Sequence, residues 1–423
     1  MVSVSANPTL GLPDHRSASA MVQNDRGPLN RSRRLTERPA SESLLQRATN
    51  SRALHASLLA LLVVSAMKAM GAFLLWRQTP WIWGLDIHGY LVGAKIGLDN
   101  GWGHIYDLAL QRPRIIGIFE TTTPSYWTPF ASPPEVAILA TPLTFLSQPL
   151  ATDLWASISA ACLVTATFAL APTSIVWRSL FVCLVTTSLA VVLCASSGNV
   201  GMLVASTEIL AFLLLAHGRQ IPAGIAVGFL IFKPQLILLV PIAMLLTGRY
   251  KFFFSFAITA SFVGVLSILL IGWSGIRQYL GVLSWVSAFP GTQEWNVNAI
   301  VGQGLLTNLA RVLLVVCVAM TALTFRNKSP APPLASALIG SVLVSPYGVY
   351  PDLTMVVVAC LIVLREDREP VPLILTLAII LETSLGDRPL IFFLELSLIA
   401  YILLRGISLE LGLRKAPPTL VAE

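Results

Sequence analysis

The chain has 423 residues, of which 55% are hydrophobic and 12% are charged, and its formal net charge is +7. Soluble domains carry about 25% charged residues, so this composition excludes a soluble protein of this size. The apolar residues lie in long runs, such as 54–76 and 221–246, and about 20 apolar residues cross the hydrocarbon core of a bilayer. Backbone groups in that core must pair within their own segment, which favours helices over the absent alternating pattern of a membrane barrel. We therefore predict an all-α, polytopic integral membrane bundle of about ten to twelve transmembrane helices.

Residues 1–50 form the longest polar segment of the chain. They contain seven arginines and no lysine, interspersed with Pro, Ser and Asn, which is typical of a disordered segment. The basic cluster 31–34 fits a nucleic-acid or lipid-binding patch, but we favour a topology signal, because basic residues beside a first transmembrane helix are retained inside. We predict a disordered, cytoplasmic basic tail at 1–50, a transmembrane domain at 51–410, a cytoplasmic tail at 411–423, and no nucleic-acid partner.

The loop 77–132 follows the first apolar run. Its four basic and four acidic residues balance, and a long neutral loop after a basic tail belongs on the outside. Tyr90, Ala94 and Leu98 share one helical stripe, and six further Trp and Tyr residues in the loop are of the kind that prefers the membrane interface. We predict one or two short interfacial helices here, on the outer membrane surface.

Four later connections are short and basic, at 249–251, 326–328, 365–368 and 405–415. Short basic loops stay in the cytoplasm, so we place these four inside and the Trp-rich segment 273–298 outside. Simple alternation then puts His217 outside, although its loop resembles an inside loop. Either the run 134–147 does not fully span the bilayer, or 221–247 is a re-entrant pair.

No catalytic motif of soluble enzymes is present: the sequence has no Walker loop, no dinucleotide-binding glycine pattern, no zinc-protease motif and no nucleophile elbow. The five cysteines lie in apolar runs without metal-ligand spacing, and we interpret them as small buried hydrophobic residues. No segment is long and polar enough for a nucleotide-sugar-binding domain. An enzyme of this composition must meet its substrate at the membrane, and nothing in the sequence requires a metal or cofactor.

Two polar residues, Asp86 and Lys233, are candidates for a chemical role. Asp86 lies about ten residues beyond the first apolar run, where a carboxylate can act as a general base or cap a helix N-terminus. Lys233 interrupts an apolar run just before Pro234, which breaks the helix. A lysine there is suited to a phosphate in a wet cavity, or it reaches the interface from a re-entrant turn.

The order of the polar motifs is more specific than any one of them. Asp86, Tyr90 and Ala94 come first, and Trp155 follows. The later elements are Gly198-Asn199-Val200-Gly201, Lys233-Pro234-Gln235, the pair Asn296 and Asn298, and Ser345-Pro346-Tyr347 through Tyr350-Pro351-Asp352-Leu353. Over residues 58–405 this series resembles glycosyltransferase family 87, the polytopic transferases that use polyprenyl-phosphate sugars. A Gln before Asn199 is missing, and Pro351 separates Tyr350 from Asp352.

The resemblance implies a GT-C type fold and transfer of a mannose-like sugar, with inversion, from a polyprenyl-phosphate donor to a lipid or glycan acceptor at the outer face. It implies Asp86 as the catalytic base. The residues it implies for substrate binding are Lys233, Gln235, Tyr90, Asn199, Asn296, Asn298, Tyr347 and Asp352. We expect membrane lipids as further partners and a bacterial inner (plasma) membrane as the location. The alternatives are a transporter or flippase of a lipid-linked or small polar substrate, and a non-catalytic relative of the family.

Overall fold

The computed structural model describes residues 83–119, 128–229, 231–288, 295–367, 369–385 and 388–411, together with a few positions between 63 and 78. Every regular element in these ranges is a helix, which confirms the predicted all-α membrane bundle. The predicted tail at 1–50 lies outside the described residues, and so does the tail at 411–423 apart from Leu411.

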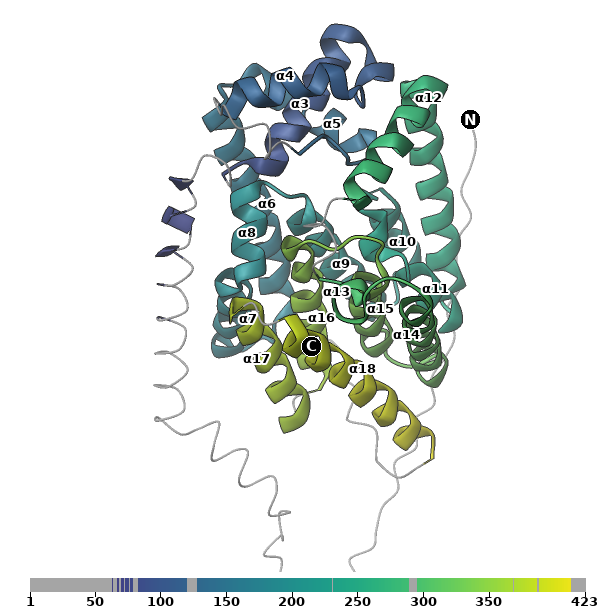
Figure 1. The fold of residues 1–423 in the computed structure, drawn as a ribbon. Helices are drawn as coiled ribbons and strands as arrows, with labels where there is room; N and C mark the ends of the chain where they lie inside the picture. The colour runs from purple at the N-terminus through teal and green to yellow at the C-terminus, as the bar shows by residue number, and fades with distance from the viewer. Residues whose placement is uncertain are drawn as a thin grey trace, which may run out of the picture. The chain divides into compact units, whose positions relative to one another are not determined.

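The predicted first outside loop contains two helices, α3 (Leu85–Asn100) and α4 (Leu108–Phe119), joined through the short η1 (Trp102–His104). They lie at one end of the bundle, beside α5 (Pro134–Ala140) and η3 (Thr141–Phe145) (Figure 1). Helix formation over 87–98 is confirmed, but the helix does not present a simple interfacial stripe. Tyr90 and Ala94 are buried while Leu98 is exposed, because α3 packs against α4, α5 and α8. Tyr106 is likewise buried, whereas Trp81, Tyr126 and Trp127 lie outside the described residues.

Four of the described helices are long and apolar enough to cross a bilayer. They are α6 (Gln148–Leu170), α12 (Tyr250–Ala288), α14 (Leu305–Thr324) and α18 (Arg388–Glu410). A fifth results if α7 (Ile175–Thr187) and α8 (Leu189–Ser197), bent by 58°, count as one span. The predicted ten to twelve spans are therefore not reached by full-length helices in the described part, because several apolar runs break into shorter helices.

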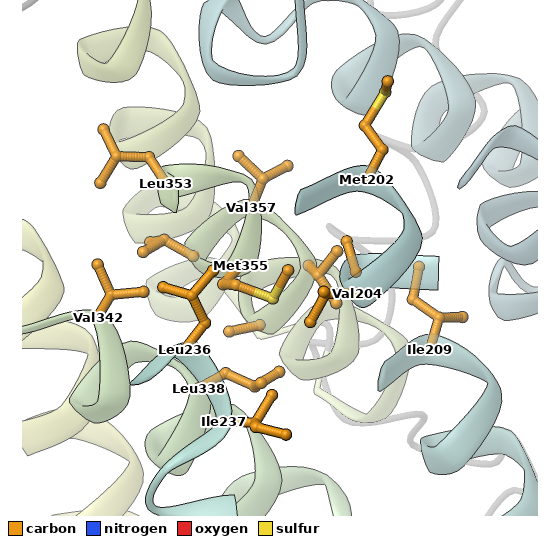
Figure 2. Packing of buried hydrophobic residues seen from close by; sticks show 14 of the residues in the cluster. Met202, Val204, Ile209, Leu236, Ile237, Leu338, Val342, Leu353, Met355 and Val357 are labelled. Atoms are coloured by element: carbon orange, nitrogen blue, oxygen red, sulfur yellow. The ribbon is translucent and has the colours of Figure 1, made fainter. Parts of the chain in front are cut away.

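The shorter helices fill the interior. They are α9 (Gly201–Ala216), α10 (Gln220–Phe229), η4 (Pro234–Ile237), α11 (Val240–Leu246), α13 (Val297–Val301), α15 (Ala331–Val344), η6 (Tyr350–Leu353), α16 (Thr354–Glu366) and α17 (Pro370–Leu385). Helices α15 and α16 are buried over almost their whole length. Figure 2 shows their side chains Leu338 and Met355 gathered with Leu236 of η4. This apolar packing fixes the segment that follows Lys233.

Two features of the fold bear on the alternatives for His217. The run 134–147 forms only α5 and η3, which together are too short to cross a bilayer at about 1.5 Å per helical residue. The run 221–247 divides into α10, η4 and α11, with Lys233 at the break. The first run thus forms short helices, and the second contains a helix break. The segment 273–298, predicted as an outside loop, is helical as far as Ala288, because α12 continues beyond a kink at Gly272.

The four basic connections make contact in two groups. Arg249 donates to the carbonyl of Lys328, Arg326 donates to the Tyr250 hydroxyl at 3.4 Å, and Lys328 pairs with Glu410. Arg405 pairs with Asp367, and Arg365 donates to the carbonyl of Leu170. Short basic segments distant in sequence therefore meet one another through direct polar contacts.

Candidate functional site

Asp86 lies in the first turn of α3, two residues after Gly84, a glycine in the left-handed conformation. The cap position belongs to Gly84, so Asp86 is not the helix cap that the sequence left open as an alternative. Its Oδ2 atom instead accepts a hydrogen bond from Nδ2 of Asn199, at 3.0 Å. The carboxylate is thus held by a residue more than one hundred positions away, at the turn between α8 and α9.

That turn is built for close approach to α3. Gly198 has φ 70°, and a Cβ atom there would lie 2.7 Å from Cβ of Ile87. The carbonyl of Gly198 accepts from Nε1 of Trp155 at 2.8 Å. Oδ1 of Asn199 accepts from the N–H of Gly201 at 2.8 Å, which fixes the amide so that Nδ2 faces Asp86. The predicted motif at 198–201 therefore positions the carboxylate.

Lys233 forms a buried ion pair with Asp352. Its Nζ atom lies 2.6 Å from Oδ1 of Asp352, and the two residues are 8% and 0% exposed. Oδ2 of Asp352 accepts from the N–H of Val349 at 3.1 Å. Because burying one charge alone is expensive, the two residues need each other. The sequence anticipated a lysine in a polar cavity but not this pairing.

The pair Asp86–Asn199 and the pair Lys233–Asp352 lie close to each other. Its ammonium lies within electrostatic range of Asp86, Asp352 and the hydroxyl of Tyr347. Tyr90 also faces this group, since its hydroxyl accepts from the N–H of Val200 at 3.4 Å and lies within electrostatic range of Asp86. By formal charge the cluster holds two carboxylates and one ammonium. We call Asp86, Asn199, Lys233, Tyr347 and Asp352 the polar centre.

The remaining predicted residues lie around the polar centre. Gln235 is buried, and its Nε2 atom has no hydrogen-bond partner in the described part of the chain. Asn296 donates to the carbonyl of Ser345 at 3.1 Å and thereby supports the loop that carries Tyr347. Asn298 is not brought to the centre, because its Oδ1 accepts from Arg311 at 2.9 Å.

His88 faces away from the polar centre, toward α6. Its Nε2 lies 2.7 Å from Nε2 of Gln148. Burial lowers the pKa of His88 to about 4, so its imidazole is neutral near pH 7. Among the described residues, no three His, Cys, Asp or Glu side chains are grouped as metal ligands would be.

Near the polar centre Cys194 is buried, as the sequence predicted, and sequence reasoning missed two residues, Tyr279 and Glu135. The thiol of Cys194 lies 3.5 Å from the carbonyl of Asn199 and is completely buried. Tyr279 and Glu135 lie on α12 and α5, beyond Tyr347. The only signal for Glu135 was its position directly before an apolar run, and Tyr279 was one of several aromatic residues in a segment interpreted as a loop.

Comparison with known proteins gives one result. The model of glycosyltransferase family 87 matches residues 130–346, just over half of the chain. None of the curated proteins or solved structures matches this chain. The matched range includes Asn199 and Lys233, while Asp86 and Asp352 lie on either side of it. The resemblance noted from the motifs is confirmed, and the chain belongs to glycosyltransferase family 87.

Proposed function

We propose that the protein transfers a mannose-like sugar from a polyprenyl-phosphate donor to a hydroxyl of a lipid or glycan acceptor. Asp86 removes the proton from the acceptor hydroxyl while its oxygen attacks the anomeric carbon. The bond from that carbon to the phosphate oxygen breaks, and the sugar configuration inverts. The products are the glycosylated acceptor and the polyprenyl phosphate, with the proton on Asp86.

The observation that carries this proposal is the meeting of Asp86 with Lys233. One residue comes from the first turn of α3 and the other from a helix break between α10 and η4, yet they lie within electrostatic range of each other. A base and a cation in one place are what inverting transfer from a phosphate requires, because charge moves from the acceptor oxygen to the leaving phosphate.

Lys233 retains the capacity to meet that phosphate although it pairs with Asp352. An ammonium has three donors, and one of them is bonded to Oδ1 of Asp352. Asp352 orients the lysine from a fully buried position. In this proposal Gln235, Tyr90 and Tyr347 supply further hydrogen bonds to the substrates, and Asn296 supports the loop of Tyr347.

The proposed orientation places the polar centre toward the outer face of a bacterial inner membrane. Its support is the grouping of the short basic connections with one another, since such connections are retained in the cytoplasm. The α3–α5 end then faces outward, where a lipid-linked donor presents its sugar.

The test is turnover by the purified protein with polyprenyl-phosphate mannose as donor. We expect Asp86→Asn to lower kcat by about 10²–10⁴-fold, the usual contribution of general-base catalysis. The asparagine preserves the size of the side chain but cannot take up the proton, and the KM of the donor should change little because the base contacts the acceptor.

The matched control is Asp99→Asn, which removes an exposed acid at the other end of the same helix and should cost little. Turnover of Asp86→Asn within a few-fold of the wild type would refute the base assignment. Movement of the labelled donor across a vesicle membrane without any sugar transfer would indicate a flippase instead.

A further inference from the structure

The part of α12 that follows its kink at Gly272 carries a tyrosine, Tyr279, near the polar centre. Gly272 has φ 64° and ψ −177°, which no helix interior permits, and it redirects the chain. In Figure 1 the two arms of α12 meet near α3, α4 and α5. Helix α12 contacts η1, and this contact sets Tyr279 against Tyr106 with 4.7 Å between the ring centroids.

Tyr279 is close to a second acid as well as to Tyr347. Its hydroxyl is within electrostatic range of Tyr347 and of Glu135, and Tyr347 is itself within range of Lys233 and Asp352. The ring of Phe130 stacks on the ring of Tyr106, with 5.4 Å between the ring centroids, and thereby holds Tyr106 in place. A row of ring contacts thus leads from Tyr90, beside the polar centre, through Phe130 and Tyr106 to Tyr279.

Glu135, near Tyr279 at the end of this row, has an unused acceptor. It occupies the first turn of α5, where one carboxylate oxygen accepts from the hydroxyl of Ser267 on α12. The other oxygen, Oε2, is buried and has no hydrogen-bond partner in the described part of the chain. Buried polar atoms are normally paired, and an oxygen left without a donor beside a functional site is explained by a donor that a ligand supplies.

We propose that Glu135 and Tyr279 form the acceptor subsite, and that the acceptor presents a neutral sugar ring. This proposal rests on the proposed function. Oε2 of Glu135 accepts a hydrogen bond from a ring hydroxyl, and the Tyr279 hydroxyl provides a second contact.

The charges near the row select against an anionic acceptor. Lys233 lies within electrostatic range of both Asp86 and Asp352, and Glu135 adds a third carboxylate near Tyr279, so a second phosphate or carboxylate on the acceptor would be repelled. A plain lipid alcohol would leave Oε2 of Glu135 unsatisfied. A glycoside satisfies both conditions.

The experiment compares three simple acceptors, octyl mannoside, octanol and octyl phosphate, with polyprenyl-phosphate mannose as the donor. We expect the wild type to prefer octyl mannoside. Glu135→Gln replaces the accepting oxygen by an N–H donor. It should raise the KM of octyl mannoside about tenfold, which corresponds to about 1.4 kcal/mol. The KM of the donor should change less than twofold.

Two further variants separate this role from a purely structural one. Ser267→Ala removes the link between α5 and α12 but leaves Oε2 of Glu135 in place, so it should keep the wild-type KM for octyl mannoside. Tyr279→Phe retains the ring and loses the hydroxyl, so it should raise that KM on its own. Thermal unfolding of each variant shows whether it is folded.

The outcomes are distinct. Equal increases in KM for Ser267→Ala and Glu135→Gln would make Glu135 a structural link and overturn the subsite. Equal use of octanol and octyl mannoside by the wild type would overturn the sugar acceptor. If the wild type transferred sugar to none of the acceptors and left the donor intact, the proposed function itself would fail.

Discussion

At the residue scale, the buried pair of Lys233 and Asp352 dominates the polar centre. The two charges lie 2.6 Å apart with almost no exposure. Such a pair adds little stability compared with apolar residues of the same volume, but removing one partner leaves an uncompensated buried charge. In the proposed function the pair therefore serves to position the lysine, and any test of Lys233 must account for its pairing with Asp352.

The first prediction concerns this pair. Lys233→Met should abolish sugar transfer and lower the stability of the protein by about 3–5 kcal/mol, because Asp352 is left buried without a counter-charge. The measurement is the unfolding midpoint in detergent micelles together with turnover.

The double variant Lys233→Met/Asp352→Asn is the control. It removes both charges, so it should recover most of the lost stability while remaining inactive. Additive losses in the double variant would show that the two residues do not act as a pair.

The sequence allowed the residues of the polar centre to be chosen but not their pairing. Asp86, Asn199 and Lys233 stand out because polar residues are rare in this apolar chain. Lys233 and Asp352 are 119 positions apart, and no local pattern indicates which acid meets which base. Glu135 was missed for the same reason, since its importance comes from an unpaired oxygen that only the packing reveals.

At the scale of the elements, the turn between α8 and α9 holds Asn199 against Asp86. Gly198 at this turn has φ 70° and touches Ile87 of α3 so closely that a side chain has no space. Backbone conformation and helix packing therefore both require glycine here. Asn199 depends on this geometry because its amide must reach the first turn of α3.

Gly198→Ala should therefore be destabilised and lose activity. The left-handed conformation alone costs an alanine about 1–2 kcal/mol, and the contact with Ile87 pushes the turn away from Asp86. We expect a lower unfolding midpoint and a fall in kcat, both measured on purified protein.

Gly218→Ala is the matched control, because Gly218 has nearly the same φ, 72°, with nothing within 4 Å of its Cβ position. It should lose only the stability due to the conformation and keep its kcat. Similar kcat values for the two variants would contradict the positioning role of the turn.

The elements themselves were only partly predictable. Apolar runs correctly indicated helices, and they failed to indicate where a run breaks. The run 177–195 divides at Ser188, and the run 221–247 divides around Lys233. Hydropathy averages over such breaks, whereas Pro234 and the unpaired backbone groups near it are stabilised only by contacts with other segments.

At the scale of the whole molecule, the polar contacts among basic connections predict a single orientation. Arg326 and Lys328 meet Tyr250 and Glu410, whereas His104 lies in η1, next to α3. In the proposed orientation the first group is cytoplasmic, as the positive-inside rule predicts, and η1 faces outward.

Single cysteines test this orientation after the five native cysteines have been replaced. His104→Cys should react with an impermeant thiol reagent in intact cells, since His104 is exposed. Arg326→Cys, which is also at an exposed position, should react only after the membrane has been permeabilised. The reverse labelling pattern would invert the orientation and place the polar centre on the cytoplasmic side.

The separation of Lys233 from Asp352 also has a consequence for biosynthesis. Ribosomes add about 5–20 residues per second, so the 119 positions between them correspond to roughly 6–24 seconds of translation. During that interval the nascent chain carries a lysine in an apolar segment without its counter-ion. A chain that stops before Asp352 never acquires this partner, and the same ion pair that organises the finished enzyme thereby distinguishes complete from truncated chains within the membrane.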